Sequence, residues 1–173
     1  MEKICVYILL QLLMLFVCDE LVYDRSNAGL TDVPDDIPTN VTTINLSHNR
    51  LTEVVLDGKW ANLSLLRFID LSYNNITNVT ESAAFPWGIE VEMNLAYNQL
   101  TSFPALSSSY AYCQLLNLSH NYITTFSMNL KLYAIGYFDL SHNPFNWLQQ
   151  DFEYDGMTRY VAVLYVSSTN CSK

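Results

Sequence analysis

A six-residue phrase occurs five times in the chain, and it constrains the fold more than any other feature. Each copy places an apolar residue first, a leucine third and an asparagine last. The five asparagines follow one another at intervals of 25, 24, 23 and 22 residues. Such regular self-similarity predicts a stack of similar coils rather than a globule with one irregular core. The copies are Ile44–Asn49, Ile69–Asn74, Met93–Asn98, Leu116–Asn121 and Phe138–Asn143.

Apolar residues alternate with polar ones through each phrase, which predicts one short strand per coil. In the first coil the inward positions are Val41, Ile44, Leu46, Asn49 and Leu51. We expect the strands to form a parallel sheet and the asparagine amides to bond to backbone groups of their own and neighbouring coils. The third coil has Glu90 where an aliphatic residue belongs, so we expect a local irregularity there.

The pattern L-x-x-L-x-L-x-x-N-x-L and its spacing resemble the leucine-rich repeat. The resemblance implies an α/β-type repeat solenoid, a horseshoe segment with a parallel concave β-sheet and a mostly irregular convex side. The segments Asp24–Asn27, Gly29–Thr31 and Val33–Asn40, continued by 41–54, resemble the N-terminal cap of Toll-like receptor ectodomains. The cysteine cluster usual in such caps is missing, and Trp147 stands where a C-terminal flank would begin with cysteine.

Four segments follow from this pattern. Residues 1–18 have the short apolar run and flanks of a secretory signal peptide, with a retained signal anchor as the alternative. Residues 19–40 are expected to be an N-terminal cap and 41–146 to hold five leucine-rich repeats. Residues 147–173 are expected to form a degenerate C-terminal repeat or cap. We predict no membrane span in the mature chain.

Composition and motifs exclude several classes of function. The formal charge of −9 with eight Lys and Arg residues argues against nucleic acid as a partner. We find no catalytic motif, no metal-ligand spacing and no cofactor-binding loop, so we predict neither an enzyme nor a cofactor. The acidic run 151–155 is interpreted as a solvated face. Cys113 falls on an inward position and is expected to be a buried free thiol rather than the disulfide partner of Cys171.

Residues at the outward strand positions are candidates for ligand binding, because exposed aromatic residues among small polar ones suit recognition. The three histidines and two tyrosines that share one repeat position are expected to stack in a single row, either as solvated consensus residues or as a pH-dependent contact. Val91, Ser47, Ser72, Ala96 and Ser119 are also expected on this concave face. The ligand-binding candidates are Phe68, Tyr73, Tyr97, His120, Tyr137 and His142.

Seven N-x-Ser/Thr sequons agree with passage through the secretory pathway. Glycans on Asn45 or Asn117 would cover part of the concave face. The candidate glycosylation sites are Asn40, Asn45, Asn62, Asn75, Asn78, Asn117 and Asn170.

These features predict a secreted or ectodomain recognition module that binds a protein, glycan or microbial ligand. The Toll-like resemblance implies a role in innate immune recognition, with a receptor partner or a second copy of the chain among the partners. The alternatives are a structural extracellular-matrix or adhesion protein with leucine-rich repeats, or a truncated fragment of a transmembrane receptor.

Overall fold

The computed structural model describes residues 20–81, 91–104, 113–124, 135–144 and 161–165. The predicted signal peptide 1–18, Glu90, Trp147, the acidic run 151–155, Asn170 and Cys171 lie outside the described residues, as does the side chain of Cys113. Within the described residues, no helix has the length and apolar character that crossing a membrane requires.

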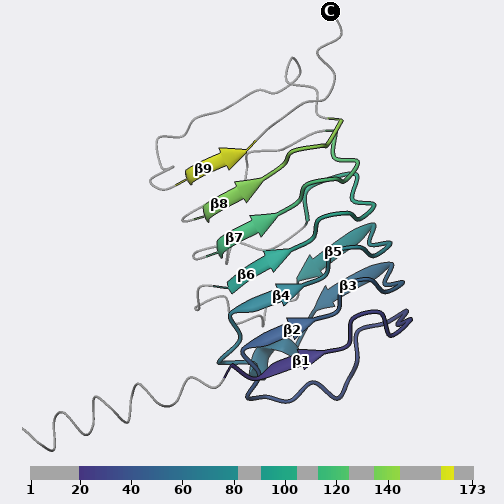
Figure 1. Cartoon of the computed structure of the whole chain (residues 1–173), viewed down its shortest axis with the longest axis vertical. Coiled ribbons are helices and arrows are strands. Elements are labelled where there is room, and N and C mark those ends of the chain that lie inside the picture. The colour runs from purple at the N-terminus through teal and green to yellow at the C-terminus, as the bar shows by residue number, and fades with distance from the viewer. Residues whose placement is uncertain (1–19, 82–90, 105–112, 125–134, 145–160, 166–173) are drawn as a thin grey trace, which may run out of the picture.

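Seven parallel strands form one sheet, with one strand from each successive coil (Figure 1). Their order is β1-β2-β4-β6-β7-β8-β9, so each strand pairs with the strand of the next coil and the sheet grows in one direction. This arrangement confirms the predicted repeat solenoid. The strands are β1 (Val22–Asp24), β2 (Thr43–Asn45), β4 (Phe68–Asp70), β6 (Val91–Asn94), β7 (Cys113–Asn117), β8 (Ile135–Asp139) and β9 (Val161–Tyr165).

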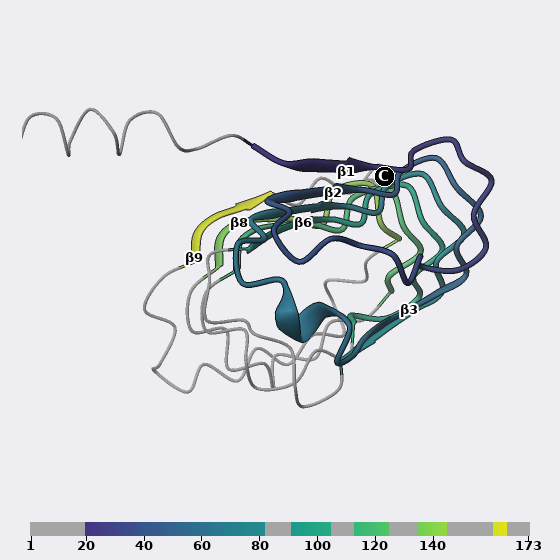
Figure 2. The same cartoon turned by 90° about the horizontal axis from the view of Figure 1, so that it is seen from below.

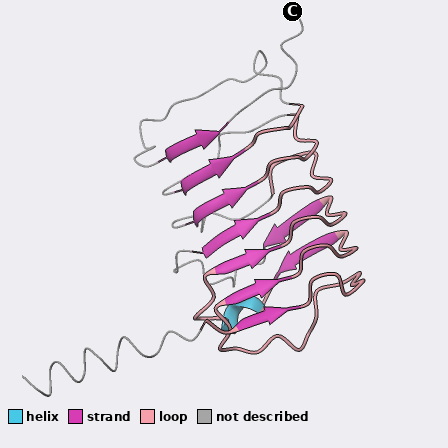
Figure 3. Cartoon of the chain, viewed as in Figure 1, coloured by secondary structure: helices cyan, strands magenta, loops and turns pink. Residues whose placement is uncertain are grey.

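A second, two-stranded parallel sheet lies on the far side of the first two repeats (Figures 2 and 3). It pairs β3 (Glu53–Leu56) with β5 (Asn78–Glu81), and the short 3-10 helix η1 (Trp60–Asn62) follows β3. The repeat pattern predicts mostly irregular chain on this side, so these two strands are a departure from the expected convex face. Both segments centre on β-branched residues with alternating burial, a pattern that favours a strand over a loop.

The core fills the space between the two sides of each coil. Ile44, Leu46, Ile69 and Leu71 are completely buried under the main sheet, and Val54 and Val79 are completely buried under the second. Burying an aliphatic side chain contributes about 1.5–3 kcal/mol. Because each coil packs only against its neighbours, this energy is shared between successive repeats.

The repeated asparagine holds adjacent coils together. The Nδ2 atom of Asn74 donates to the carbonyl oxygens of Leu46, Leu71 and Ser72 at 3.0, 3.1 and 3.2 Å. Its Oδ1 atom accepts the backbone N–H of Leu51, in the preceding coil, at 3.0 Å. Asn49, Asn98, Asn121 and Asn143 make corresponding bonds. The predicted role of this residue is therefore confirmed.

The N-terminal segment contributes the first strand of the sheet and a polar clasp beneath it. The buried Tyr23 donates its hydroxyl to Asp36, and the Arg25 guanidinium lies 4.8 Å above the Tyr23 ring centroid. Arg25 also forms an ion pair with Asp36 at 3.7 Å, and Lys59 of the first repeat pairs with Asp35. These contacts fix the loop before β2 against the end of the solenoid.

The third coil departs from the regular pattern, as the sequence predicts. The pairing of β6 with β7 shifts register after Val91, which aligns with Cys113, so that Glu92 aligns with Leu115. Val91 was expected on the concave face, and that expectation is wrong, because the side chain is 2% exposed and belongs to the core. The apolar side chain enters the core one residue later than the repeat pattern predicts.

Candidate binding surface

Two parallel rows of side chains cover the concave face, which is the side of the main sheet turned away from the core. Successive strands pair in register, so equivalent residues line up across the sheet. The row nearer the strand starts, here called the mixed row, contains Thr43, Phe68, Glu92, Leu115 and Tyr137. The row at the strand ends, here called the Asx row, contains Asp24, Asn45, Asp70, Asn94, Asn117 and Asp139.

Every member of the Asx row has the same local function. Its Oδ1 atom accepts the backbone N–H of the residue two positions later, as in Asp70 with Ser72 at 2.9 Å and Asp139 with Ser141 at 2.8 Å. The same bond recurs in the other four members at 2.8–3.1 Å. Asparagine and aspartate both satisfy this turn, which is an Asx-turn. The position therefore tolerates either charge state without loss of the turn.

Four of the small residues that lie two positions after the Asx row are buried. Ser47, Ser72, Ala96 and Ser119 are at most 6% exposed, so their predicted place on the concave face is wrong. The chain has already left the strand at this point, and the period-two alternation on which the expectation rested no longer applies.

Five rings stack in one continuous row, as the sequence predicts. The ring centroids of His48, Tyr73, Tyr97, His120 and His142 follow one another at 4.4, 4.3, 4.0 and 4.0 Å, with interplanar angles of 8–11°. We call these five residues the ring stack. Stacked rings cover one another's faces, so the stack presents ring edges, hydroxyls and imidazole nitrogens to solvent.

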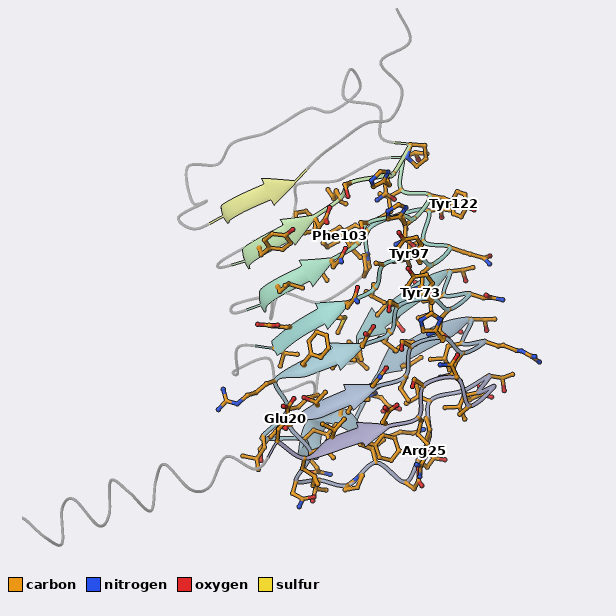
Figure 4. All side chains as sticks on the ribbon, viewed as in Figure 1. Glu20, Arg25, Tyr73, Tyr97, Phe103 and Tyr122 are labelled. Atoms are coloured by element: carbon orange, nitrogen blue, oxygen red, sulfur yellow. The ribbon has the colours of Figure 1, made fainter. Side chains whose placement is uncertain are left out.

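The ring stack lies beside the concave face rather than on it. All five residues have φ between 54° and 57°, and they sit in the turn that follows each strand. Asn27 has φ of 52° at the equivalent place in the N-terminal cap, where its N–H donates to Ser47. Tyr73 and Tyr97 are 45% and 41% exposed, and Tyr122, 60% exposed, lies on the same lateral edge (Figure 4).

The stack perturbs two of its titrating groups. Burial lowers the pKa of His120 below its ordinary value of 6.5, the neighbouring His142 lowers it further, and Asp139 opposes both. Burial raises the pKa of the Tyr73 hydroxyl, and its interaction with the Tyr97 hydroxyl adds to that effect. A second positive charge is therefore disfavoured where two imidazoles stack.

Several carboxylates on or beside the concave face take part in no ion pair within the described part of the chain. No ion pair of the described residues involves Glu20, Asp70, Glu92 or Asp139, since the two that occur lie at the N-terminal clasp. Glu20 reaches the mixed row, where it accepts the Thr43 hydroxyl at 2.8 Å. Sequence reasoning did not single out these carboxylates, because the repeat pattern leaves strand positions free to vary and Glu20 lies outside the repeats.

The predicted binding residues thus fall into two groups. Phe68 and Tyr137 are half-buried members of the mixed row, three strands apart in the main sheet. Tyr73, Tyr97, His120 and His142 belong to the ring stack at the lateral edge. No cluster of three or more His, Cys, Asp or Glu residues in the described ranges is arranged to hold a metal ion.

The six sequons in the described residues differ in exposure. Asn40, Asn62, Asn75 and Asn78 are exposed and lie outside the concave face, with Asn78 on β5. Asn45 and Asn117 are half-buried members of the Asx row. The concave face is consequently free of sequons except at these two positions in the described residues.

Comparison with known proteins agrees with the fold. Residues 40–59 match the family model described as Leucine Rich Repeat. Human Toll-like receptor 3 is 40% identical over 58 residues, which cover 34% of this chain and 6% of that protein. Mouse Tsukushi is 34% identical over 131 residues, covering 69% of this chain and 35% of that protein. Bovine fibromodulin is 31% identical over 110 residues, which cover 63% of this chain and 28% of that protein.

The chain spans well under half the length of each of these relatives. The repeated phrase, the parallel solenoid and these matches together identify the chain as a leucine-rich-repeat protein, a relative of Toll-like receptor 3, Tsukushi and fibromodulin.

Proposed function

We propose that this chain is a recognition module that binds a macromolecular ligand, protein or glycan, through the concave face and the adjoining ring stack. The observation that carries the proposal is the mixed row, in which Phe68, Leu115 and Tyr137 lie on neighbouring strands of one sheet together with the polar Thr43 and Glu92. Aromatic residues on a preformed surface are typical energetic centres of protein interfaces. The core is packed on the other side of the sheet, and the mixed row contributes no side chain to it.

The setting that best suits such a module is outside the cell. The seven sequons and the apolar N-terminal run support secretion and glycosylation. The 40% identity with human Toll-like receptor 3 supports a receptor-type role in innate immune recognition. We infer no enzymatic activity.

A site-specific photo-crosslinker tests the binding surface directly. The full chain, secreted from eukaryotic cells, carries the photoreactive amino acid at Phe68 in one variant and at Val55 in the control. Val55 is an exposed apolar residue of β3, on the other side of the solenoid. Crosslinked partners from cell surfaces or conditioned medium are expected at Phe68 and not at Val55. Crosslinks confined to Val55 would place recognition on the convex side instead.

A further inference from the structure

The charges of the concave face indicate what kind of ligand it accepts. Asp70 and Asp139 stand three strands apart in the Asx row, and Glu92 lies between them in the mixed row. Neighbouring strands are about 4.8 Å apart, so Asp70 and Asp139 are separated by about 14 Å across the sheet. Glu20 extends the same acidic surface toward β1 and β2 through its bond with Thr43.

These carboxylates are not used by the fold. The Asx-turn occupies only the Oδ1 atoms of Asp70 and Asp139, and three other coils form the same turn with a neutral asparagine. The negative charge at these two positions is therefore unnecessary for the turn. Since no ion pair of the described residues engages these two carboxylates, their negative charge is available to a positively charged partner.

Apolar side chains lie beside the carboxylates in the mixed row. Phe68 adjoins Glu92 across the β4–β6 pair, and Leu115 adjoins Glu92 across the β6–β7 pair. Lysine and arginine side chains match such a surface, because their aliphatic stems pack on apolar groups while the charged ends reach carboxylates. A small cation or a polyamine would leave the aromatic residues uncovered.

We propose that the concave face binds an extended, lysine- or arginine-rich polypeptide segment laid across the strands. This inference rests on the proposed function, since it names the ligand class of the same surface. The strands from β1 to β8 span about 24 Å, which an extended peptide of about eight residues crosses. Cationic residues spaced a few positions apart then meet Asp70, Glu92 and Asp139 in turn.

Fluorescent peptides of about ten residues test the proposal, their length set by the span of the sheet. The probes are oligolysine, oligoglutamate and a glycine-serine peptide, titrated against the full chain at low and at physiological ionic strength. We expect binding of oligolysine only, weakened by salt because the ion pairs are partly exposed. Stronger binding of the glycine-serine or glutamate peptide would overturn the cationic class.

A matched pair of double variants places the binding on this face. D70N/D139N removes two charges from the Asx row, and E53Q/D57N removes two charges from β3 and the turn after it. Both are made in cells without N-glycosylation, because D70N and D139N each complete an Asn-Leu-Ser sequon. We expect D70N/D139N to weaken oligolysine binding about tenfold and E53Q/D57N less than about twofold.

Equal losses in the two variants would overturn the proposal, because attraction would then depend on net charge alone. No oligolysine binding at low ionic strength would also overturn it. Unchanged circular dichroism and an unchanged unfolding midpoint of D70N/D139N would show that the fold is retained. Crosslinking at Phe68 does not depend on the partner's charge, so crosslinks that persist while oligolysine fails would retain the proposed function and remove only the ligand class.

Discussion

The imidazole of His120 lies stacked on the imidazole of His142, with ring centroids 4.0 Å apart and planes inclined by 11°. The opposite face of His120 is covered by Tyr97. Burial, and then the charge of His142, lower the pKa of His120, while Asp139 favours its protonation. The folded state therefore disfavours a positive charge on His120.

This arrangement predicts a loss of stability in mild acid. Because the pKa of His120 is lower in the folded state, the unfolded chain binds more protons at this group. The free energy of unfolding then falls as pH drops through the ordinary value of 6.5, and this fall ends below the folded-state pKa. Urea unfolding at about pH 7.5 and about pH 5 measures the difference. His120→Gln is expected to reduce it.

His48→Gln is the control for this prediction, since His48 stacks on Tyr73 with no second imidazole against it in the described residues. His48→Gln is expected to retain most of the fall in the free energy of unfolding between neutral pH and mild acid. A decline of the same size in wild type and His120→Gln would show that other groups cause it.

The buried asparagine of the third repeat allows a test of the bonds between coils. Asn98 donates to the carbonyls of Leu71, Leu95 and Ala96 and accepts the N–H of Ile76. Asn98→Ala leaves these groups without partners away from water, and we expect a loss of about 3 kcal/mol in the free energy of unfolding. Chemical denaturation measures this loss.

Asn94→Ala is the matched control, because Asn94 makes one bond at the half-buried end of a strand. Its expected cost is about 1 kcal/mol. Asn98→Asp should behave like Asn98→Ala, since a carboxylate cannot donate to three carbonyls. A cost for Asn98→Ala no larger than for Asn94→Ala would contradict the assigned role.

The sequence predicts the structure well at positions that have the same structural role in every coil. The core positions Ile44, Ile69 and Met93, and the asparagines that bridge coils, recur because each coil repeats the same packing and the same orphan backbone groups. The ring stack is predicted on the same grounds. A packing or hydrogen-bonding requirement that recurs in every coil selects the same residue type at each recurrence, and the repeat in the sequence records it.

Features that depend on interactions within only one or two coils were not predicted from the sequence. Within the described residues the strands β3 and β5 pair with each other alone, and their signal is a few β-branched residues outside the repeat pattern. Ser72 and Ser119 were assigned to the surface by extending strand alternation past the strand end. The carboxylates of Asp70, Glu92 and Asp139 were not predicted as a group. They stand out because they form no ion pair within the described residues, and the spacing of residues in a sequence does not show which charges pair.

The backbone of the ring stack predicts a difference between two substitutions at one residue. Tyr73 has φ of 54°, a conformation that asparagine tolerates and β-branched residues resist. Tyr73→Asn and Tyr73→Val both remove the stacking with His48 and Tyr97. We therefore expect Tyr73→Val to be less stable than Tyr73→Asn by about 1 kcal/mol in denaturant unfolding. Equal stabilities would show that the turn relaxes without cost.

The clasp of the N-terminal cap predicts an acid-sensitive contribution to stability. The hydrogen bond from the Tyr23 hydroxyl is the main reason that the pKa of Asp36 lies below its ordinary 3.8. This contribution is present above that value and is lost as pH falls through the folded-state pKa. Tyr23→Phe should lower the unfolding midpoint at neutral pH, with the difference from wild type shrinking in strong acid. A difference independent of pH would assign the effect to packing.

Glycan mapping of the secreted chain tests both the modification sites and the binding surface. Asn40, Asn62, Asn75 and Asn78 are exposed, so glycans there extend into solvent. Asn45 lies between Asp24 and Asp70 in the Asx row, and its Oδ1 accepts both the N–H and the hydroxyl of Ser47. Glycopeptide mass spectrometry is expected to find glycans at the four exposed sites and none at Asn45 or Asn117. Full occupancy at Asn45 would cover the concave face and move the ligand to the ring stack or the convex side.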